Sequence, residues 1–462
     1  MLNRNVLAID LGASNGRGTV GRFDGGKLTA EVVHRFPNQV VEEGGRLFWD
    51  HRQLHCEILN SLEVCKRLGI LIDCVAVDAW AQDYALLDSA GDLLGRPRSY
   101  RDPRTKASAP LVAKRFPAEL LFAITGVGPV EFSTLNQLVH ERRFNEATFE
   151  SARALLFMPG LFTYLLCGEL SCDFTIPSIA NLMDIAARGI SLEIVHAFGI
   201  GRLMPALQTP GTIVGKTSRE VGELTGYDGV PVALVGGHDT ASAASAVPAE
   251  GDFLFISSGT WSMLGITAGA PLLENEVMRC GYSNCLSADG KTMLLKGVNG
   301  MFLVQQCMRE WLAAGLETSY EHLEGYALGH ECRTTFDVDA VDASAASMPL
   351  EIARLLREGG RCEPSSPEDC YLMILGSLAA KYAKEVGELE RLAGKTFGEL
   401  HLVGGGARSK ALKSLSERAT GKRVVAGPCE ATAIGNIAYQ LVALGDIGRG
   451  DVASIVASYV DS

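Results

Sequence analysis

The feature that most constrains this chain is a pair of similar segments, each an apolar strand, a turn of small residues and a second strand. The first segment, over residues 6–23, reads VLAIDLGASNGRGTVGRF, and the second, over 253–266, reads FLFISSGTWSMLGI. Their turn glycines, Gly12 and Gly259, are separated by more than half the chain. Turns of small residues leave backbone N–H groups that can face an anion. The repeat therefore predicts two related domains that hold a polyphosphate between them.

Length and charge support this division. A chain of 462 residues is too long for one ordinary hydrophobic core, so two domains are expected. We place the boundary where a run of small residues, ASAASAVPAEGD, interrupts the pattern, which gives domains 1–247 and 248–462. The net charge of −12 argues against a nucleic-acid backbone as the main partner.

Apolar runs and the spacing of the cysteines indicate where the protein is located and whether it forms disulfides or binds a metal. No apolar run reaches the ~18 residues that span a bilayer, and the apolar stretch at the N-terminus is too short for a signal peptide, so we expect a cytoplasmic protein. The 12 cysteines are scattered without a CxxC pair, and we interpret them as buried thiols with no disulfide and no metal. A monomer or a homodimer is expected.

Apolar strands alternate with amphipathic helices in both halves, which predicts α/β sheets with crossover connections. We expect a helix over 51–68 capped by Asp50 and a long helix over 367–392. Thr217 and Glu220 have the spacing of a capping box at the start of another helix. Trp261 is expected in the core, and 316–370 gives the weakest pattern.

The first candidate site is DLGASNGR, which begins at Asp10. An acidic residue at the end of a strand, followed by a turn that contains Gly12 and Gly16, suits a phosphate with its Mg²⁺ ion. A hairpin that binds no ligand has the same local sequence. The pattern is neither GxGxxG leading into a helix nor a Walker loop.

The second candidate is GGHDTASA, over 236–243. Asp239 ends an apolar strand and precedes a helix, where a carboxylate can accept a proton from a substrate hydroxyl. A simple helix cap is the alternative interpretation. His238, taken by itself, is interpreted as a structural histidine.

Two further glycine-containing turns follow. LVGGGARSK, over 402–410, places three glycines between a strand and a helix, where a purine or a phosphate can lie against the backbone. SSGTWS, over 257–262, contains Thr260, whose hydroxyl could bond a γ-phosphate. Either pattern alone is a weak signal, and its value comes from the presence of the others.

These pieces occur in one order along nearly the whole chain. The order is DLGASNGR at Asp10, RF at Arg35, FWD at Phe48, VDAWAQDYALLD at Val77, YRDPRT at Tyr100, FSTLNQL at Phe132, GGHDTASA at Gly236, SSGTWSMLG at Ser257, LLK at Leu294, HLVGGG at His401 and AGPCEATAIGNI at Ala426. The set resembles the FGGY carbohydrate kinases. The resemblance implies two ribonuclease-H-like domains of the actin-like ATPase fold, with a deep interdomain cleft.

The resemblance also implies the roles of particular residues. Asp239 would be the general base, and Asp10 would lie near the Mg²⁺ ion. The residues that match sugar contacts of the family are Ala81, His238, Thr240, Gly297 and Asn299. The residues that match ATP contacts are Ala13, Ser14, Asn15, Gly16, Arg17, Thr260, Gln305, Gly404, Gly405 and Gly406.

The resemblance implies transfer of the γ-phosphoryl group of ATP to the 1-hydroxyl of a ketose, with L-rhamnulose expected. Two positions depart from the pattern of kinases for that sugar: Ala81 replaces a glycine, and Gly297 replaces an asparagine, although Asn299 lies two residues on. A site built to bond a hydroxyl discriminates through that partner. Kinases for fuculose, ribulose or xylulose are therefore the alternative, followed by a non-catalytic nucleotide- or sugar-binding regulator.

Overall fold

The computed structural model describes residues 3–316 and 318–461, and they form two compact units. Unit 1 contains residues from 1–248, 268–294 and 431–462, and unit 2 contains 249–267 and 295–430. The expected division into 1–247 and 248–462 differs from these units, because two segments of the second half pack with the first. It stays a prediction about domain organisation, whereas the α/β class is confirmed in each unit.

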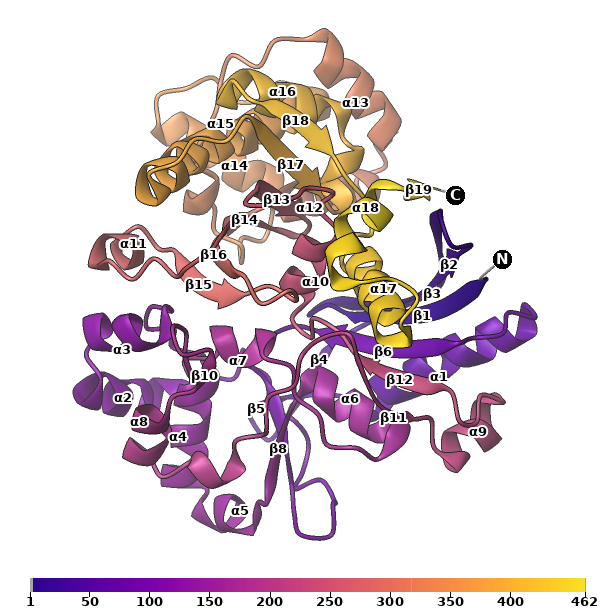
Figure 1. Cartoon of the computed structure of the whole chain (residues 1–462). Helices are drawn as coiled ribbons and strands as arrows, with labels where there is room; N and C mark the ends of the chain where they lie inside the picture. Colours follow the sequence, from indigo (N-terminus) through magenta and orange to yellow (C-terminus); the bar gives the residue numbers. More distant parts are fainter. Residues whose placement is uncertain (1–2, 317, 462) are drawn as a thin grey trace. The chain divides into compact units, whose positions relative to one another are not determined.

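Unit 1 is built on a seven-stranded sheet with the order β11-β12-β6-β1-β2-β3-β19 (Figure 1). In chain order its strands are β1 (Arg4–Leu11), β2 (Asn15–Phe23), β3 (Leu28–Pro37), β6 (Cys74–Ala79), β11 (Thr212–Lys216), β12 (Pro231–Leu234) and β19 (Val460–Asp461). Three two-stranded sheets are formed by β4 (Val40–Glu43) with β5 (Arg46–Trp49), β7 (Tyr84–Leu87) with β8 (Ala154–Phe157), and β9 (Met183–Asp184) with β10 (Gly189–Ile190). β1, β6 and β12 are parallel neighbours, and β1–β2 is the expected first hairpin.

Unit 1 also contains α-helices, several of which contact this sheet. They are α1 (His51–Arg67), α2 (Ala109–Arg115), α3 (Ala118–Thr125), α4 (Thr134–Phe144), α5 (Glu146–Ser151), α6 (Met158–Cys167), α7 (Thr175–Ile179), α8 (Leu192–Ala197), α9 (Arg219–Thr225), α10 (Asp239–Ser245), α11 (Asn275–Arg279), α17 (Ala431–Leu444) and α18 (Val452–Ala457). Short 3₁₀ helices are η1 (Pro103–Ala107), η2 (Gly201–Leu203) and η5 (Arg449–Asp451), and a further strand is β15 (Ser283–Leu286).

Two helix caps test the sequence analysis. Asp50 caps α1 as expected, since its carboxylate accepts from the Gln53 N–H. The capping of α9 was predicted one residue too early: Ser218 is the cap, and the Thr217 hydroxyl donates to the Tyr227 carbonyl instead. Capping spacing fixes such a helix start only to within a residue or two.

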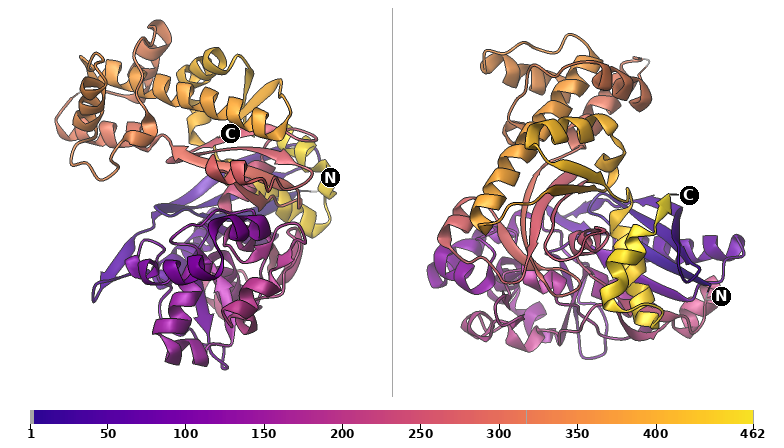
Figure 2. Two further views of the ribbon diagram at one scale, coloured as in Figure 1. Left: turned by 90° about the vertical axis from the view of Figure 1, so that its left-hand side faces the viewer. Right: turned by 45° about the horizontal axis from the view of Figure 1, so that its top comes forward.

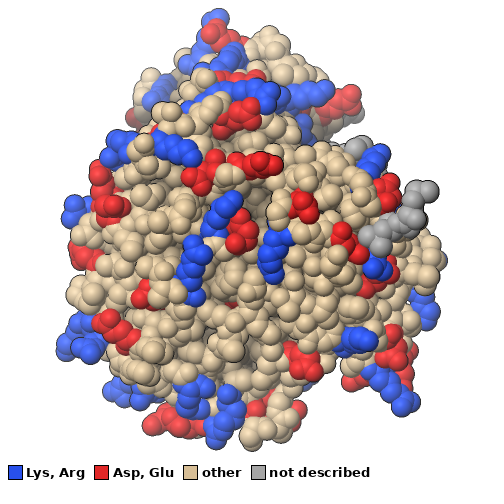
Figure 3. Space-filling model, in the orientation of Figure 1, with Lys and Arg blue, Asp and Glu red and all other residues tan. Residues whose placement is uncertain are grey.

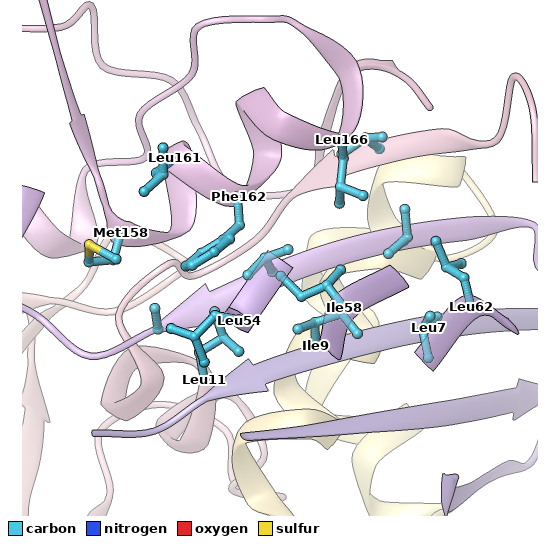
Figure 4. Packing of buried hydrophobic residues seen from close by; sticks show 14 of the residues in the cluster. Leu7, Ile9, Leu11, Leu54, Ile58, Leu62, Met158, Leu161, Phe162 and Leu166 are labelled. Atoms are coloured by element: carbon cyan, nitrogen blue, oxygen red, sulfur yellow. The ribbon is translucent and has the colours of Figure 1, made fainter. Parts of the chain in front are cut away.

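Alternation along β1 sends its side chains to two different layers. Leu7, Ile9 and Leu11 pack in the hydrophobic core against α1 and α6, as Figure 4 shows. Asp10 therefore points to the opposite face together with Ala8. β6 repeats the pattern, because Val75 and Val77 face the core and Asp78 faces away from it.

The face that carries Asp10 and Asp78 is covered by α17, which lies beside the sheet of unit 1 in both views of Figure 2. α17 crosses α10 so closely that a Cβ on Gly435 would lie 1.8 Å from the Ser242 carbonyl oxygen. Only glycine fits there, so Gly435 allows α17 to pack closely on α10 within unit 1.

Unit 2 contains most of a second sheet, whose order is β15-β16-β14-β13-β17-β18. The remaining strands are β13 (Leu254–Ser258), β14 (Trp261–Ala268), β16 (Thr292–Asn299), β17 (Glu399–Val403) and β18 (Arg423–Ala426). Its helices are α12 (Phe302–Ala313), α13 (Tyr320–Gly329), η3 (Val338–Ala340), α14 (Met348–Glu358), α15 (Pro367–Ala393), η4 (Gly405–Arg408) and α16 (Lys410–Thr420).

Four expectations for unit 2 can be compared with these elements. β13–β14 is the expected second hairpin, and α15 is the expected long helix. The segment with the weakest pattern contains α13, η3 and α14. Trp261 was expected in the core, but it is 59% exposed, because it lies at the start of β14 beside the turn.

The described helices include none with the length and apolarity needed to cross a membrane. On the face drawn in Figure 3, basic and acidic side chains are interspersed. Neither sign of charge dominates this face.

Candidate active site

Three aspartates lie at the carboxyl ends of three neighbouring parallel strands of unit 1. Asp10 and Asp78 are directly paired in the register of β1 and β6. Asp239 follows His238, which forms a parallel bridge with Ala79 at the end of β6. Ligands of open α/β sheets bind outside these carboxyl ends. The fold thus collects three acids at the edge where chemistry is expected.

Asp78 is the most deeply buried of the three. Its side chain is fully buried; Oδ2 accepts a 2.6 Å hydrogen bond from the Asn436 amide, and Oδ1 has no partner among the described residues. Burial raises the pKa of Asp78 well above its usual value, and the charges of Asp10 and Asp239 raise it further. Arg17, whose Nε lies 3.3 Å from Asp10 Oδ2, partly offsets this repulsion. Such a cluster favours a bound cation.

Asp239 combines a raised pKa with access to solvent. Burial among neighbouring groups raises its pKa to about 6, although a third of its side chain (33%) remains exposed. The Thr240 hydroxyl donates to Asp239 Oδ1 over 3.1 Å. A carboxylate with a pKa near 6 is mostly ionised at neutral pH, and it is a stronger base than an ordinary aspartate.

His238 lies against the same carboxylate, with Nε2 3.5 Å from Asp239 Oδ1. Burial lowers the pKa of His238 to about 4, so the imidazole is neutral at pH 7. Its Nδ1 is buried without a hydrogen-bond partner in the described structure. A neutral ring with an unpaired nitrogen can bond a hydroxyl of a ligand.

The loop that carries these residues is held by Asp173, which the sequence analysis did not single out. Thr175 donates through both N–H and hydroxyl to Asp173 Oδ1, and the same hydroxyl accepts from the His238 N–H over 3.0 Å. A Cβ on Gly237 would lie 2.2 Å from Asp173 Oδ2. The glycine before His238 is therefore required for this close approach.

The turn of the first hairpin contains the expected phosphate contacts, Ala13 to Arg17. Asn38 fixes the turn, because its amide donates to the Gly12 carbonyl over 2.8 Å and its N–H donates to the Ser14 carbonyl over 3.1 Å. The N–H groups of Ala13 and Ser14 have no acceptor within the described residues. The turn therefore presents free donors, as an anion site requires.

Ala81 follows the end of β6, beside the same strand ends. The preceding residue, Trp80, donates its N–H to the Leu11 carbonyl over 3.1 Å. The next residue, Gln82, has a φ of 80°, which is unfavourable for a residue with a side chain. Thr134 holds it there, because its N–H donates to Gln82 Oε1 and its hydroxyl to the Gln82 carbonyl. Strained backbone of this kind is concentrated at functional sites.

The residues present fit a magnesium ion that is held partly by phosphates. No group of three or more metal-binding side chains occurs in the described part of the chain. Asp78 nevertheless has a buried oxygen without a partner, next to Asp10. Mg²⁺ is commonly bound by one or two carboxylates, with substrate phosphates and water completing its shell.

Unit 2 contains a separate cavity of about 460 Å³. The residues that line it are Ser258, Gly259, Met301, Gln305, Tyr320, Glu321, Glu324, Tyr371, Gly405, Gly406, Arg408 and Ser409. The expected ATP contacts Gln305, Gly405 and Gly406 are among them. Glu324 organises one wall by accepting from the Tyr371 and Ser409 hydroxyls and, over 3.1 Å, from the Ala411 N–H.

The glycine turn of unit 2 packs directly on the second hairpin. A Cβ on Gly406 would lie 2.2 Å from Ser258 Oγ, and one on Gly404 would lie 3.0 Å from the Ser258 carbonyl oxygen. Gly404 also has a φ of 81°. These glycines allow the turn after β17 to approach the hairpin and form the cavity floor.

The other predicted residues of unit 2 lie outside the lining of this cavity. The Thr260 carbonyl accepts from the Phe302 N–H over 3.1 Å at the start of α12. Gly297 is exposed on β16. Asn299 is 7% exposed, and its amide donates to the Val338 carbonyl over 2.7 Å, so this side chain already has a structural partner.

Sequence reasoning missed Asp78, Asn436 and the aromatic walls of the cavity. Asp78 had a signal, since VDAW and IDLG both place an aspartate next to the end of a buried strand. Asn436 lies 358 residues from Asp78, within an ordinary helical pattern, and had no local signal.

Comparison with known proteins gives the family. Residues 5–246 match the N-terminal domain model of the FGGY family of carbohydrate kinases, and residues 254–444 match its C-terminal domain model. The chain belongs to the FGGY family of carbohydrate kinases. The resemblance that the motifs suggested is thereby confirmed.

Individual relatives cover nearly the whole chain. The rhamnulokinase of Bacteroides thetaiotaomicron is 34% identical over 96% of this chain and 92% of its own length. That of Halalkalibacterium halodurans is 33% identical over 96% of this chain and 94% of its own length.

Solved structures show the fold. The xylulose kinase from Rhodospirillum rubrum matches with a TM-score of 0.79 at 16% identity, covering 98% of this chain and 92% of that one. Plasmodium falciparum glycerol kinase with ADP matches with a TM-score of 0.79 at 14% identity, covering 100% and 93%. The two-domain α/β fold expected for an FGGY kinase is confirmed.

Proposed function

We propose that this FGGY kinase is a rhamnulokinase, which transfers the γ-phosphoryl group of ATP to the 1-hydroxyl of L-rhamnulose. The observation that carries the proposal is the identity of 30–34% with several rhamnulokinases over nearly the whole chain. The products are L-rhamnulose 1-phosphate and ADP.

Asp239 is the general base of the proposed reaction. It accepts the proton of the sugar hydroxyl as that oxygen attacks the γ-phosphorus and the bond to the β-phosphate oxygen breaks. Its exposed third and its pKa of about 6 support this role. His238 and Thr240 flank the carboxylate, where they can bond neighbouring hydroxyls and orient the ketose.

In this proposal each unit has its own set of nucleotide-binding groups. The N–H groups of the Ala13–Arg17 turn and the Arg17 guanidinium bind phosphate oxygens, and Thr260 is proposed to contact the γ-phosphate. The cavity of unit 2 takes the adenosine, with Gln305, Gly405 and Gly406 on its walls and Gly404 next to them in the turn. Its volume of about 460 Å³ lies within the range of small-molecule sites.

Asp10 and Asp78 would hold the magnesium ion. When bound, the ion neutralises charge that develops on the phosphate oxygens during transfer. The two carboxylates belong to residues that are paired in the register of β1 and β6, and Arg17 limits their repulsion.

A kinase for another ketose is the second candidate, and two residues favour it. Ala81 adds a methyl group at the sugar turn, and Gly297 contributes no side chain where a hydrogen-bonding group is expected. Asn299 is a poor substitute, because its amide is already bonded to the Val338 carbonyl.

The decisive experiment measures kcat/KM by coupled ADP release for rhamnulose, fuculose, ribulose and xylulose. We expect rhamnulose to be preferred by at least about tenfold, which corresponds to the net contribution of about one hydrogen bond. A preference for another of these sugars would replace the substrate but retain the kinase. The absence of ADP release with every ketose would favour a non-catalytic nucleotide- or sugar-binding protein. ADP release that does not depend on a ketose would indicate ATP hydrolysis and would count against both kinase proposals.

A further inference from the structure

Unit 1 contains a second cavity, of about 220 Å³, whose lining includes none of the three strand-end aspartates. It lies between the β4–β5 hairpin, β7 and the end of α4. The polar side chains that line it are Arg46, Tyr84, Arg96, Arg98, Arg104, Glu141, Asn145 and Thr148. Four arginines around one small cavity are unusual in an acidic protein with a net charge of −12.

Three hydrogen-bond donors of this lining are buried without an acceptor. They are the Tyr84 hydroxyl and the Nε–H groups of Arg98 and Arg104. Tyr84 is only 6% exposed, and the Arg104 side chain only 4%. An unpaired buried donor is costly and rare in folded proteins. The lining therefore calls for a ligand that supplies acceptors.

The acidic neighbours do not satisfy these donors. Glu141 Oε1 lies 3.8 Å from Arg104 Nε and 4.0 Å from the Arg98 guanidinium, beyond hydrogen-bond distance. Its other oxygen accepts from the Asn145 amide over 2.7 Å. Arg46 is exposed and has no ion pair within the described residues.

The remaining arginines keep partners outside the cavity. Arg98 bonds Asp102 over 2.6 Å, and Arg96 bonds Glu43 over 3.1 Å. These ion pairs orient the two side chains without supplying acceptors to their unpaired neighbours. The cavity thus has fixed walls and an excess of donors over acceptors.

We propose that this cavity binds a phosphate group, either as inorganic phosphate or as part of a small phosphate monoester. Three buried donors without acceptors and Arg46 match the several acceptor oxygens of a tetrahedral phosphate better than the two of a carboxylate. The cavity is smaller than the roughly 300–1,000 Å³ of drug-sized sites, which excludes a whole nucleotide.

The cavity is linked to the turn where the sugar is proposed to bind. Arg104 Nη2 donates to Gln137 Oε1 over 2.5 Å, and Gln137 Nε2 donates to Asp83 Oδ1 over 3.1 Å. Asp83 also accepts from the Trp80 indole over 3.0 Å, next to Ala81. A phosphate on Arg104 would therefore change the affinity for the ketose, a consequence that rests on the proposed function.

The test is calorimetric titration of the full-length protein with inorganic phosphate, at constant pH and at ionic strength matched with sodium chloride. Tyr84→Phe removes the unpaired hydroxyl, and Arg46→Gln removes the free cation. Arg115→Gln is the matched control, because Arg115 is an exposed arginine on α2 away from the lining. Tyr84→Phe costs the fold no hydrogen bond, so we expect it to melt at or above the wild-type temperature.

We expect saturable binding that weakens about tenfold or more in Tyr84→Phe and about three- to tenfold in Arg46→Gln, with Arg115→Gln unchanged. Unchanged affinity in both cavity variants would place the phosphate elsewhere, for example on the first hairpin, and would overturn the proposal. So would the lack of saturable heat at about 10 mM phosphate.

Two further experiments ask which phosphate compound binds the cavity and whether its binding affects the ketose site. A ketose 1-phosphate titrated in the same way shows whether free phosphate or a monoester binds more tightly. The ketose KM is then measured with and without phosphate, and we expect a shift in wild type that Tyr84→Phe abolishes. A KM that does not move would overturn the coupling alone. Failure of every ketose as a substrate would count against the proposed function, while the calorimetry would still decide the site.

Discussion

The two hairpins share a backbone plan but differ in the side chains at the end of their first strand. In β1–β2, Asp10 pairs with Asp78 of the parallel neighbour β6 and with Arg17 across the hairpin. In β13–β14, Ser257 pairs with Val403 of β17 and with Met263 across the hairpin. A charged trio in one unit is thus replaced by an uncharged trio in the other.

Their turns are also fixed differently. The Gly12–Asn15 turn is tied by Asn38 and leaves two N–H groups free. The carbonyls of Gly259 and Thr260 accept from the Met301 and Phe302 N–H groups, which start α12. The first turn is therefore fixed by the Asn38 side chain, and the second is fixed by the start of a helix. The two hairpins thus share a backbone plan, but only the first carries reactive acids.

The largest expected effect comes from removing the proposed base at the end of the third strand. Asp239→Asn keeps the size of the side chain but cannot accept the proton, so we expect turnover to fall by about 10²–10⁴-fold. Nucleotide affinity, measured by calorimetry, should change little. Near-normal turnover would exclude Asp239 as the base and weaken the contrast between the units.

Asp10→Ser tests the difference between the hairpins directly, because it gives the first hairpin a serine like Ser257 of the second. We expect turnover to fall by about 10²–10³-fold, because a charged group that acts on the transition state is lost. The Mg²⁺ activation curve should move to higher concentration. Ser257→Ala is the control in the other hairpin and should keep turnover close to wild type. Equal effects of the two changes would show that the hairpins are equivalent after all.

The third prediction concerns the helix that leaves the second half and packs on unit 1. Gly435→Ala would force a Cβ into the Ser242 carbonyl, and we expect a loss of about 2–4 kcal/mol in the free energy of unfolding in urea. Gly387→Ala is the matched control, since no atom lies within 4 Å of its added Cβ on α15. Alanine should stabilise that helix by about 0.5–1 kcal/mol. Similar behaviour of the two variants would refute the close crossing of α10 and α17.

The pKa of Asp239 should determine how kcat/KM depends on pH. The pKa of Asp239 is about 6 and the base acts when ionised, so kcat/KM should rise with pH and level off above a midpoint near 6. Below the midpoint the loss approaches tenfold per pH unit. His238, with a pKa of about 4, stays neutral over this range. Arg17→Gln removes a charge that lowers the pKa of Asp239, so its midpoint should move upward. A midpoint that does not move would show that the ionisation of Asp239 does not determine the pH profile.

The smallest effect is expected at the anchor of the second hairpin. The buried Tyr382 hydroxyl lies 2.7 Å from Ser262 Oγ, and Tyr382→Phe should lower the free energy of unfolding by about 1 kcal/mol. Tyr439→Phe is the comparison on α17, because the hydroxyl of Tyr439 has no hydrogen bond in the described structure. We expect a smaller change there. Equal losses would show that the hydrogen bond contributes nothing specific to the hairpin.

Local patterns predicted much of the fold. The helix after Asp50, the long helix α15 and both hairpins were found from periodicity, caps and turn residues. Errors arose where neighbouring residues are almost equally suited to the same role, as Thr217 and Ser218 are at the cap of α9. Trp261 was misassigned because exposure depends on where the end of a strand lies in the folded unit.

The residues of the candidate site also divide into those that the local sequence identifies and those that it does not. Asp10, Asp239 and the glycine turns could be identified because each sits at a recognisable end of a strand. The roles of these residues came from resemblance to a family, and they remain predictions. The cavity of arginines around Tyr84 had no sequence signal, since its lining comes from four separate stretches of the chain.

The sequence alone determined most of the strands and helices and identified two of the acids at strand ends, Asp10 and Asp239. It could do so because backbone periodicity and turn chemistry act over a few residues. Only the tertiary structure decided that Asp78 lies beside Asp10 and that Asn436 reaches it from α17. It also decided that the second half of the chain supplies a helix to unit 1. Such contacts depend on sheet register and on the close approach of small residues, and neither is encoded in any one segment.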